Sequence, residues 1–294
     1  MRPVTVTAGP FAAAAATAVA LAQTAAAAGE LAINGTLATA GWIGTASIAG
    51  QVLTATVNTQ GQIAGGFPFP SLSGLGVAPG TAVIGPGPGV SAAGTPGGLS
   101  WLVNIAQTVA SRTMYTNAVA KIAVPAQLTL TTSGADAGVL ATIVGTNWAG
   151  DAITEVVTLV STGVATSVLS YATVTQVSLS AATAGTVSVG FAQTGSSPWV
   201  RLDDFAPGPV SITCALTGAA TYSVQGTNQD PNDPTSPVAP QSMAWVNSPD
   251  AAAVGATTSI NTSYAQAPRF VRVITTTGAG SVAMTVAQQG AVPY

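Results

Sequence analysis

A series of short alternating runs of β-branched residues, each ended by turn residues, constrains the fold most. From residue 125 onward the chain contains PAQLTLTTSG, GVLATIVGTN, AITEVVTLVSTG, ATVTQVSLSAA and GTVSVGFAQTG. Alternation with a period of two places successive side chains on opposite faces of a strand. Strands that recur at intervals of about 10–15 residues are typical of an antiparallel sandwich or barrel. The runs therefore predict an all-β fold.

Charge is the scarcest property of this chain. Its 294 residues include 6 Lys or Arg, 9 Asp or Glu and no His, so that 5% are charged, where ordinary domains have about 25%. Without His, the usual Ser-His-Asp, Cys-His and zinc centres cannot be built from this chain alone. Cys214 cannot form an intramolecular disulfide, and six basic residues are too few to follow a phosphate backbone. We expect no enzyme activity, no cofactor and no nucleic-acid partner, and favour a subunit of an assembly.

The charges that exist are unevenly spread. Residues 31–111 contain none, whereas eleven lie between Asp136 and Arg272, which indicates at least two structural units. Within the charge-free region, Asn34-Gly35 predicts a hairpin turn, and residues 51–66 predict a strand that turns at Gly61. The Gly/Pro-rich segment that follows predicts tight turns between very short strands, with TAVIG and WLVNIAQTVA as strand candidates.

Two further hairpins are expected in the last hundred residues. PVSITCALTG and ATYSVQGTNQ predict the first, and RFVRVITTTG and SVAMTVAQQG predict the second. Residues 125–147 and 209–228 share an opening Pro, two alternating strands around a Gly turn and a final Gly-Thr-Asn. Duplication of a hairpin explains this similarity, and so does convergence on the same strand-turn-strand pattern.

The N-terminal stretch Phe11–Ala28 is rich in Ala and Thr. A signal peptide is one interpretation, but the preceding MRPVTVTAGP alternates like a strand and is not a compact basic region. A membrane span needs about 20 strongly apolar residues, and Gln23 interrupts this run. We therefore expect no membrane anchor here and predict an extended arm over residues 1–30 that becomes ordered on a partner.

Three groups of polar side chains could carry chemistry. Asp203 and Asp204 are adjacent and on a strand would point to opposite faces, so no catalytic dyad is expected. Asp230, Asn232 and Asp233 could collect a calcium ion, but the bidentate Glu of a calcium loop is missing, and Asx-type turns are the better interpretation. Glu155 would lie on the more apolar face of its strand, as a hydrogen-bonded anchor or at an edge. No catalytic, cofactor-binding or metal-binding residue is assigned.

The five tryptophans, at positions 42, 101, 148, 199 and 245, are evenly spaced along the chain. This spacing favours separate core or interface anchors over one carbohydrate-stacking platform. A host-surface glycan is kept as an alternative partner.

Three segments resemble virion proteins of tailed bacteriophages. Residues 51–114, with GLGVAPGT and the closing QTVAS, are similar to a small β-module of phage structural proteins. Residues 128–190 resemble the β-sandwich unit of head-associated, decoration-like proteins. PWVRLDDF together with RFVRVITTTGAGSVAMTVAQQG resembles the C-terminal domain that is often attached to that unit.

This resemblance implies a split first sandwich, because AAGELAINGTL leads directly into a strand like IAVPAQLTLTTSG in such proteins. We predict tandem antiparallel β-sandwich modules of the jelly-roll or immunoglobulin-like type. Their expected order is an arm over 1–30, a sandwich from 31–42 plus 118–200, an inserted Gly/Pro-rich β-module over 43–117 and a C-terminal β-sandwich over 201–294.

The resemblance also implies the function, a structural component of a phage particle that decorates the outer capsid surface or forms a head fibre. Its expected partners are the major capsid protein or another virion protein and further copies of itself, with a trimer favoured. A tail or baseplate adaptor or fibre is the alternative, and a carbohydrate-binding surface adhesin is a weaker one.

Overall fold

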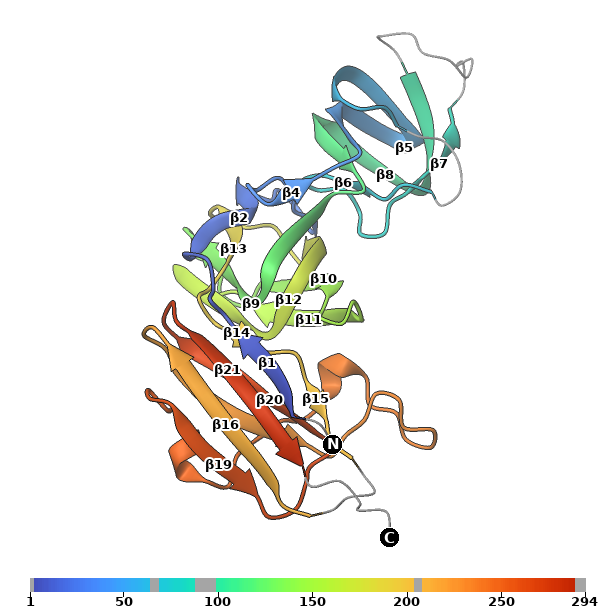
Figure 1. Cartoon of the computed structure of the whole chain (residues 1–294). Helices are drawn as coiled ribbons and strands as arrows, with labels where there is room; N and C mark the ends of the chain where they lie inside the picture. The colour runs from blue at the N-terminus through green and yellow to red at the C-terminus, as the bar shows by residue number, and fades with distance from the viewer. Residues whose placement is uncertain (1–2, 64–68, 88–98, 204–207, 289–294) are drawn as a thin grey trace.

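The computed structural model describes residues 3–63, 69–87, 99–203 and 208–288 (Figure 1). These residues form strands and two short 3-10 turns, without an α-helix among them. The predicted all-β fold, with several antiparallel sheets, is confirmed. Figure 1 shows three β-modules that follow one another along an elongated molecule, with the strands of residues 42–116 at one end and those of the C-terminal region at the other.

The middle module is an eight-stranded antiparallel sheet. Its main path is β11 (Ala152–Thr158), β10 (Leu140–Thr146), β12 (Gly163–Leu179), β9 (Val119–Thr132), β13 (Val187–Phe191) and β2 (Ala15–Gln23), while β3 (Gly29–Glu30) pairs with β12 and β4 (Ala38–Thr39) pairs with β9. Every alternating run found after residue 125 contributes a strand. The inward residues of these runs, including Leu128, Leu130 and Ile143, are buried in the core.

Strand β12 contains a bulge. The pairing of β12 with β9 shifts between Thr166 and Ser170, so that residues 167–169 do not continue the ladder. Glu155 of β11 satisfies the exposed backbone there, because its carboxylate accepts hydrogen bonds from the N–H groups of Val168 (2.6 Å) and Leu169 (3.0 Å). Glu155 is thus both a hydrogen-bonded anchor and a residue of the edge strand, as the two interpretations of the sequence allowed.

The C-terminal module has two facing sheets. One contains, in order, β1 (Val4–Ala8), β21 (Ser281–Gln288), β16 (Val210–Thr217) and β19 (Ile260–Tyr264). The other contains β14 (Gly195–Ser196), β20 (Phe270–Thr277), β17 (Thr221–Thr227) and β18 (Val246–Asn247), with β15 (Val200–Arg201) also on β20. The 3-10 turns η1 (Pro240–Ser242) and η2 (Ala251–Ala253) flank β18.

Both hairpins predicted for this module are wrong. β16 and β17 lie in different sheets, and so do β20 and β21. Each pair is joined by a corner that crosses from one sheet to the other, and the two corners pack together. The N–H of Gly280 donates to the carbonyl of Ala219 (2.9 Å), and a Cβ on Gly278 would lie 2.3 Å from the same oxygen. Turn residues mark where a strand ends but not whether the next strand pairs with it.

The inserted module, named here for the strands between Trp42 and Thr116, has its own core. β5 (Trp42–Gln60) and β8 (Leu99–Thr116) pair along most of their length, with β6 (Leu72–Ser73) and β7 (Val83–Pro86) on the other side of β8. β5 bends at Gly50 (φ 63°), and the Thr56 hydroxyl of its second half donates to the Thr45 carbonyl of its first half. The predicted strands TAVIG and WLVNIAQTVA correspond to β7 and β8. A separate cluster that includes Trp42, Ile48, Leu53, Leu72 and Met114 fills the interior.

The N-terminal stretch is built into both sandwiches of its own chain. β1 pairs with β21, where Val4 lies opposite Val286, and β2 pairs with β13, where Ala20 lies opposite Val189. Ala18, Val19 and Ala20 are fully buried. The arm expected over residues 1–30 therefore corresponds, from residue 3 on, to strands packed on this chain. Ala and Thr are small enough to fill an edge position against β13, which the sequence pattern did not indicate.

The Asn34-Gly35 pair does not make the predicted hairpin turn. The segment instead runs beside β2, with hydrogen bonds from the Gly35 N–H to the Val19 carbonyl (3.0 Å) and from the Leu21 N–H to the Asn34 side chain (2.8 Å). A Cβ on Gly35 would lie 2.3 Å from the carbonyl oxygen of Ala18. Glycine is required here for close approach of two backbones and not for a turn with positive φ.

Replacement of Gly35 tests this close approach. We expect Gly35→Ala to lower the free energy of unfolding by about 2 kcal/mol or more, because the added methyl group must displace the backbone of β2. Gly85→Ala is the matched control, since a Cβ there meets no atom within 4 Å. Chemical denaturation of both variants gives the comparison, and equal effects would contradict the packing described.

Glu30 lies where the inserted module meets the middle sandwich. Its backbone exchanges hydrogen bonds with the 76–77 segment, from the Glu30 N–H to the Val77 carbonyl and from the Gly76 N–H to the Glu30 carbonyl (both 2.9 Å). Its carboxyl group is buried and accepts a hydrogen bond from the backbone of Gly80. Burial raises the pKa of Glu30 from its ordinary value of 4.5 to about 8.

This pKa predicts a pH-dependent stability. Between pH 4.5 and about 8 the folded chain binds the Glu30 proton more tightly than the unfolded chain does, so stability is greatest below this range and falls as the pH rises through it. We expect the thermal midpoint of the protein to drop by several degrees from pH 5 to pH 9. Glu30→Gln should flatten this profile, and an unchanged slope in the variant would refute the role of Glu30.

Candidate functional site

Three of the five tryptophans meet at the junction of the middle and C-terminal modules. Trp148 follows β10, Trp199 precedes β15 and Trp245 precedes β18. The ring centroids of Trp148 and Trp199 are 6.0 Å apart in an edge-to-face arrangement, and those of Trp199 and Trp245 are 5.3 Å apart. The interpretation of the tryptophans as separate anchors is therefore wrong for these three, although Trp42 is a core anchor of the inserted module.

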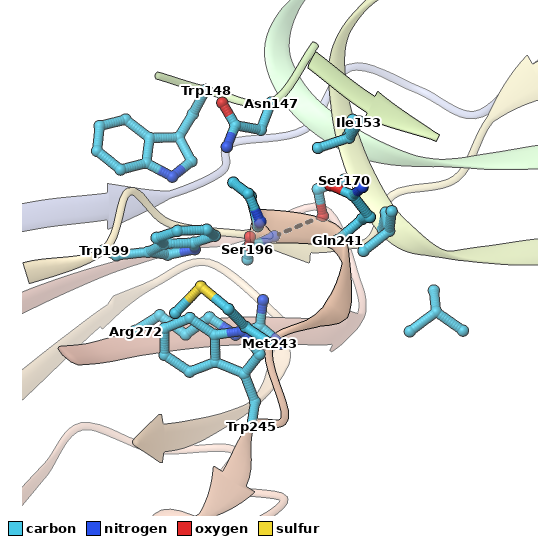
Figure 2. A pocket seen from close by; sticks show the side chains of 13 residues that line it. Asn147, Trp148, Ile153, Ser170, Ser196, Trp199, Gln241, Met243, Trp245 and Arg272 are labelled. Carbon is cyan, nitrogen blue, oxygen red and sulfur yellow. Dashed lines mark hydrogen bonds between the residues drawn. The ribbon is translucent and has the colours of Figure 1, made fainter. Parts of the chain in front are cut away.

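The three indoles line a hollow of about 100 Å³ between the modules. Figure 2 shows them one above another on one side, with Ile153, Ser170 and Gln241 on the other. The full lining is Asn147, Trp148, Ile153, Val168, Leu169, Ser170, Ser196, Trp199, Pro240, Gln241, Met243, Trp245 and Arg272. The β12 bulge held by Glu155 thus forms one wall, and η1 with the residues after it forms another.

The turn that carries Trp148 is held by Asn147. The Asn147 side-chain oxygen accepts from the N–H groups of Ala149 (2.8 Å) and Asp151 (3.0 Å), and its amide donates to the Asp151 carboxylate (2.9 Å). Asn147 is buried, whereas the Trp148 side chain is exposed. An internally bonded turn therefore presents a partly solvated indole at the mouth of the hollow.

Arg272 is the charged residue of the hollow. It lies on β20 with its guanidinium carbon 4.2 Å from the centre of the Trp245 ring, a cation–π contact. Its Nε and one terminal nitrogen donate to the side-chain oxygen of Gln225 (3.0 and 2.8 Å). Burial lowers the pKa of Arg272 to about 10, so it remains cationic at neutral pH. No carboxylate among the described residues pairs with it.

Two further contacts join the middle and C-terminal modules at this site. The backbone N–H of Ser196 donates to the Ser170 hydroxyl (3.1 Å), and η1 packs against β11. The indoles come from segments that follow or precede strands, and strand ends of neighbouring modules meet at their junction. The sequence could have indicated this site through the position of each tryptophan next to a strand end. The even spacing of the tryptophans along the chain favoured separate sites instead.

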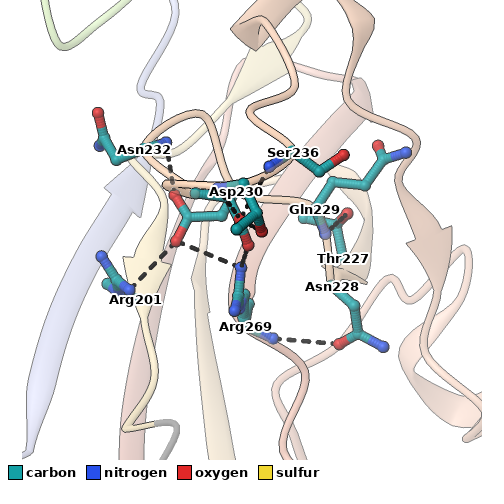
Figure 3. Close-up of polar contacts among 10 residues, drawn as sticks. Arg201, Thr227, Asn228, Gln229, Asp230, Asn232, Ser236 and Arg269 are labelled. Atoms are coloured by element: carbon teal, nitrogen blue, oxygen red, sulfur yellow. Dashed lines mark hydrogen bonds and ion pairs between the residues drawn. The ribbon is translucent and has the colours of Figure 1, made fainter.

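The acidic loop expected as a calcium candidate is a pair of Asx turns. Asp230 accepts from the Asn232 N–H (2.8 Å) and Asp233 accepts from the Thr235 N–H (3.0 Å), which confirms that interpretation. Arginines neutralise both carboxylates (Figure 3): Arg201 lies 3.1 Å from Asp230, and Arg269 lies 2.7 Å from Asp233 and 3.6 Å from Asp230. The Arg269 guanidinium holds the pKa of Asp233 well below its usual range.

The remaining candidates do not gather at one place. The backbone of Asp203 exchanges hydrogen bonds with the Gln288 side chain, and Asp204 lies outside the described residues. Cys214 is buried in the C-terminal sandwich, where burial raises the pKa of its thiol to about 11. Among the described residues, no three His, Cys, Asp or Glu side chains form a cluster able to hold a metal ion. The same residues include no helix long and apolar enough to span a membrane.

The Asp230 carboxylate is expected to stabilise the C-terminal module. Its side chain is 2% exposed, so Asp230→Asn would leave two arginines beside a neutral amide and should cost about 2–3 kcal/mol of unfolding free energy. Asp233→Asn is the control within the same loop and should cost clearly less, because Asp233 is more exposed and solvent screens its ion pair. Urea unfolding distinguishes them, and equal losses would argue against the buried pair.

Comparison with known proteins finds no family model, curated protein or solved structure that matches this chain. The hollow at the junction of the middle and C-terminal modules is the candidate site. It places aromatic faces, hydrogen-bond donors and one cation around a small hollow.

Proposed function

We propose that this chain is a structural component of a tailed-bacteriophage particle, mounted on the outer capsid surface as a decoration or head-fibre protein. It acts as a homo-oligomer, with a trimer favoured, and binds the major capsid protein or another virion protein. The sequence resemblance of residues 51–114 and 128–190 motivates the proposal. The observation that carries it is the exposed apolar edge of the middle module.

This edge consists of β11 and the first half of β12. Val156, Val164 and Val168 are 56%, 55% and 74% exposed, and Leu140 and Val160 beside them are also exposed. β11 pairs only with β10 among the described strands. Soluble monomers protect such an edge with charged side chains or proline. Here the carboxylate of Glu155 is bound to the β12 backbone and offers no such protection.

The arrangement of the modules fits a mechanical role. The two sandwiches share one continuous hydrophobic cluster, whereas the inserted module has a separate one. Figure 1 shows the inserted module at the far end of the molecule from the C-terminal sandwich. A body of two fused sandwiches that carries a distal β-module is a suitable design for a protein that projects from a surface.

Removal of the apolar edge should weaken self-association. We expect Val156→Asp combined with Val164→Asp to shift the protein from oligomer to monomer, because each carboxylate would be buried in the interface. Val57→Asp is the matched control, since Val57 is 53% exposed on β5 of the inserted module. Light scattering coupled to size exclusion measures the mass, and a monomeric parent protein would rule out this interface.

Location in the particle tests the proposal itself. Phage heads and tails can be separated and each analysed by mass spectrometry for peptides of this chain. We expect the peptides in the head fraction at a copy number that matches the capsid lattice. Peptides confined to tails would support the tail adaptor or fibre alternative, and absence from both would refute a virion role.

A further inference from the structure

We propose that the hollow between Trp148, Trp199, Trp245 and Arg272 binds a sugar that carries a carboxylate, such as a hexuronic or sialic acid residue at the end of a glycan. This binding site is independent of the proposed place in a virion. It is argued from the aromatic faces, the unused hydrogen-bond donors, the charge and the size of the hollow.

The aromatic surface suits a pyranose ring. Indoles offer flat apolar faces on which the C–H groups of a sugar can stack, while their N–H groups remain available to hydroxyls. Trp148 is 37% exposed at the mouth, and Trp199 and Trp245 are half-buried behind it. Because Asn147 holds the Trp148 turn, little backbone freedom of that turn would be lost on binding.

Several hydrogen-bond donors of the hollow are not used within the described residues. The indole N–H groups of the three tryptophans and the side-chain amide of Gln241 make no hydrogen bond with other described residues. Arg272 uses two of its nitrogens on Gln225, which leaves further N–H groups of the guanidinium available. A ligand rich in oxygen acceptors would satisfy these groups.

The positive charge of Arg272 favours an anionic ligand. Arg272 is cationic and lacks a carboxylate partner among the described residues, and no Asp or Glu lines the hollow. The nearby carboxylates of Glu155 and Asp151 accept hydrogen bonds from β12 and from Asn147. A cationic ligand such as a quaternary amine would be repelled by Arg272, although three aromatic rings could otherwise form a cage for it. A carboxylate would supply the missing partner of the guanidinium.

The size limits the ligand to one ring. A hollow of about 100 Å³ that is open on one side can hold part of a single pyranose, with the rest of a glycan outside. The site therefore recognises a terminal or branch residue and does not enclose a polysaccharide chain.

The test uses the full chain and titration of tryptophan fluorescence with four probes, which are glucuronic acid, N-acetylneuraminic acid, glucose and choline. We expect saturable quenching by at least one of the acids at millimolar concentrations or below, weaker binding as salt is raised, and at least tenfold weaker binding of glucose and choline. Equal binding of glucose, or tighter binding of choline, would overturn the acidic-sugar assignment, and failure of both acids to bind would overturn the site.

Variants locate the binding. Arg272→Gln should remove the preference for the acid over glucose, and Trp148→Ala should weaken acid binding about tenfold. Trp101→Phe, in the inserted module, is the control that should leave it unchanged. Acid binding that survives both site variants would place it elsewhere and contradict the proposal. Because Arg272 is part of a packed strand, thermal midpoints are recorded, and Gln241→Ala provides a second, exposed variant that should weaken binding without loss of stability.

Discussion

The pairing of the N-terminal strands with both sandwiches is the contact on which the rest of the structure depends. β1 adds an edge strand to β21, 280 residues away in the chain, and β2 adds one to β13. Between them the chain passes directly from one sandwich to the other. This connection, together with the Ser196–Ser170 hydrogen bond, brings the end of β10 close to the start of β15. The tryptophan-lined hollow exists because these two modules are held side by side.

Because charged residues are scarce, few ion pairs contribute to the stability of the two fused modules. Stability comes from backbone pairing and from buried Val, Ile, Leu and Ala, and only a few ionisable groups are placed inside. Three of these groups have a clear structural role, because Glu155 satisfies the β12 bulge, Glu30 joins the inserted module to the middle one, and Asp230 ties two arginines together. Arg272 differs from them because no carboxylate pairs with it in the described part of the chain. Its charge is therefore available to an anionic ligand in the hollow.

The sequence predicted strands far better than their partners. Alternation of apolar and polar residues is a local property, so the strands after residue 125 and the pair β7 and β8 could be identified from it. Pairing is a long-range property, and the corners at Gly278 and Gly280 resemble hairpin turns in sequence although they cross between sheets. For the same reason the Ala/Thr-rich segment that forms β2 does not reveal in its sequence that it pairs with β13. The site was not predictable either, since Trp148, Trp199 and Trp245 are far apart in the sequence and meet only through the junction.

Hydrogen exchange of the intact protein, followed by mass spectrometry, tests most directly whether the N-terminal strands close this body. We expect peptides covering Val4–Ala8 and Ala15–Gln23 to exchange as slowly as those of β21 and β13, and the inserted module to exchange with a rate of its own. Exchange of the first 23 residues within seconds, while β21 and β13 stay protected, would contradict this closure and restore a free arm.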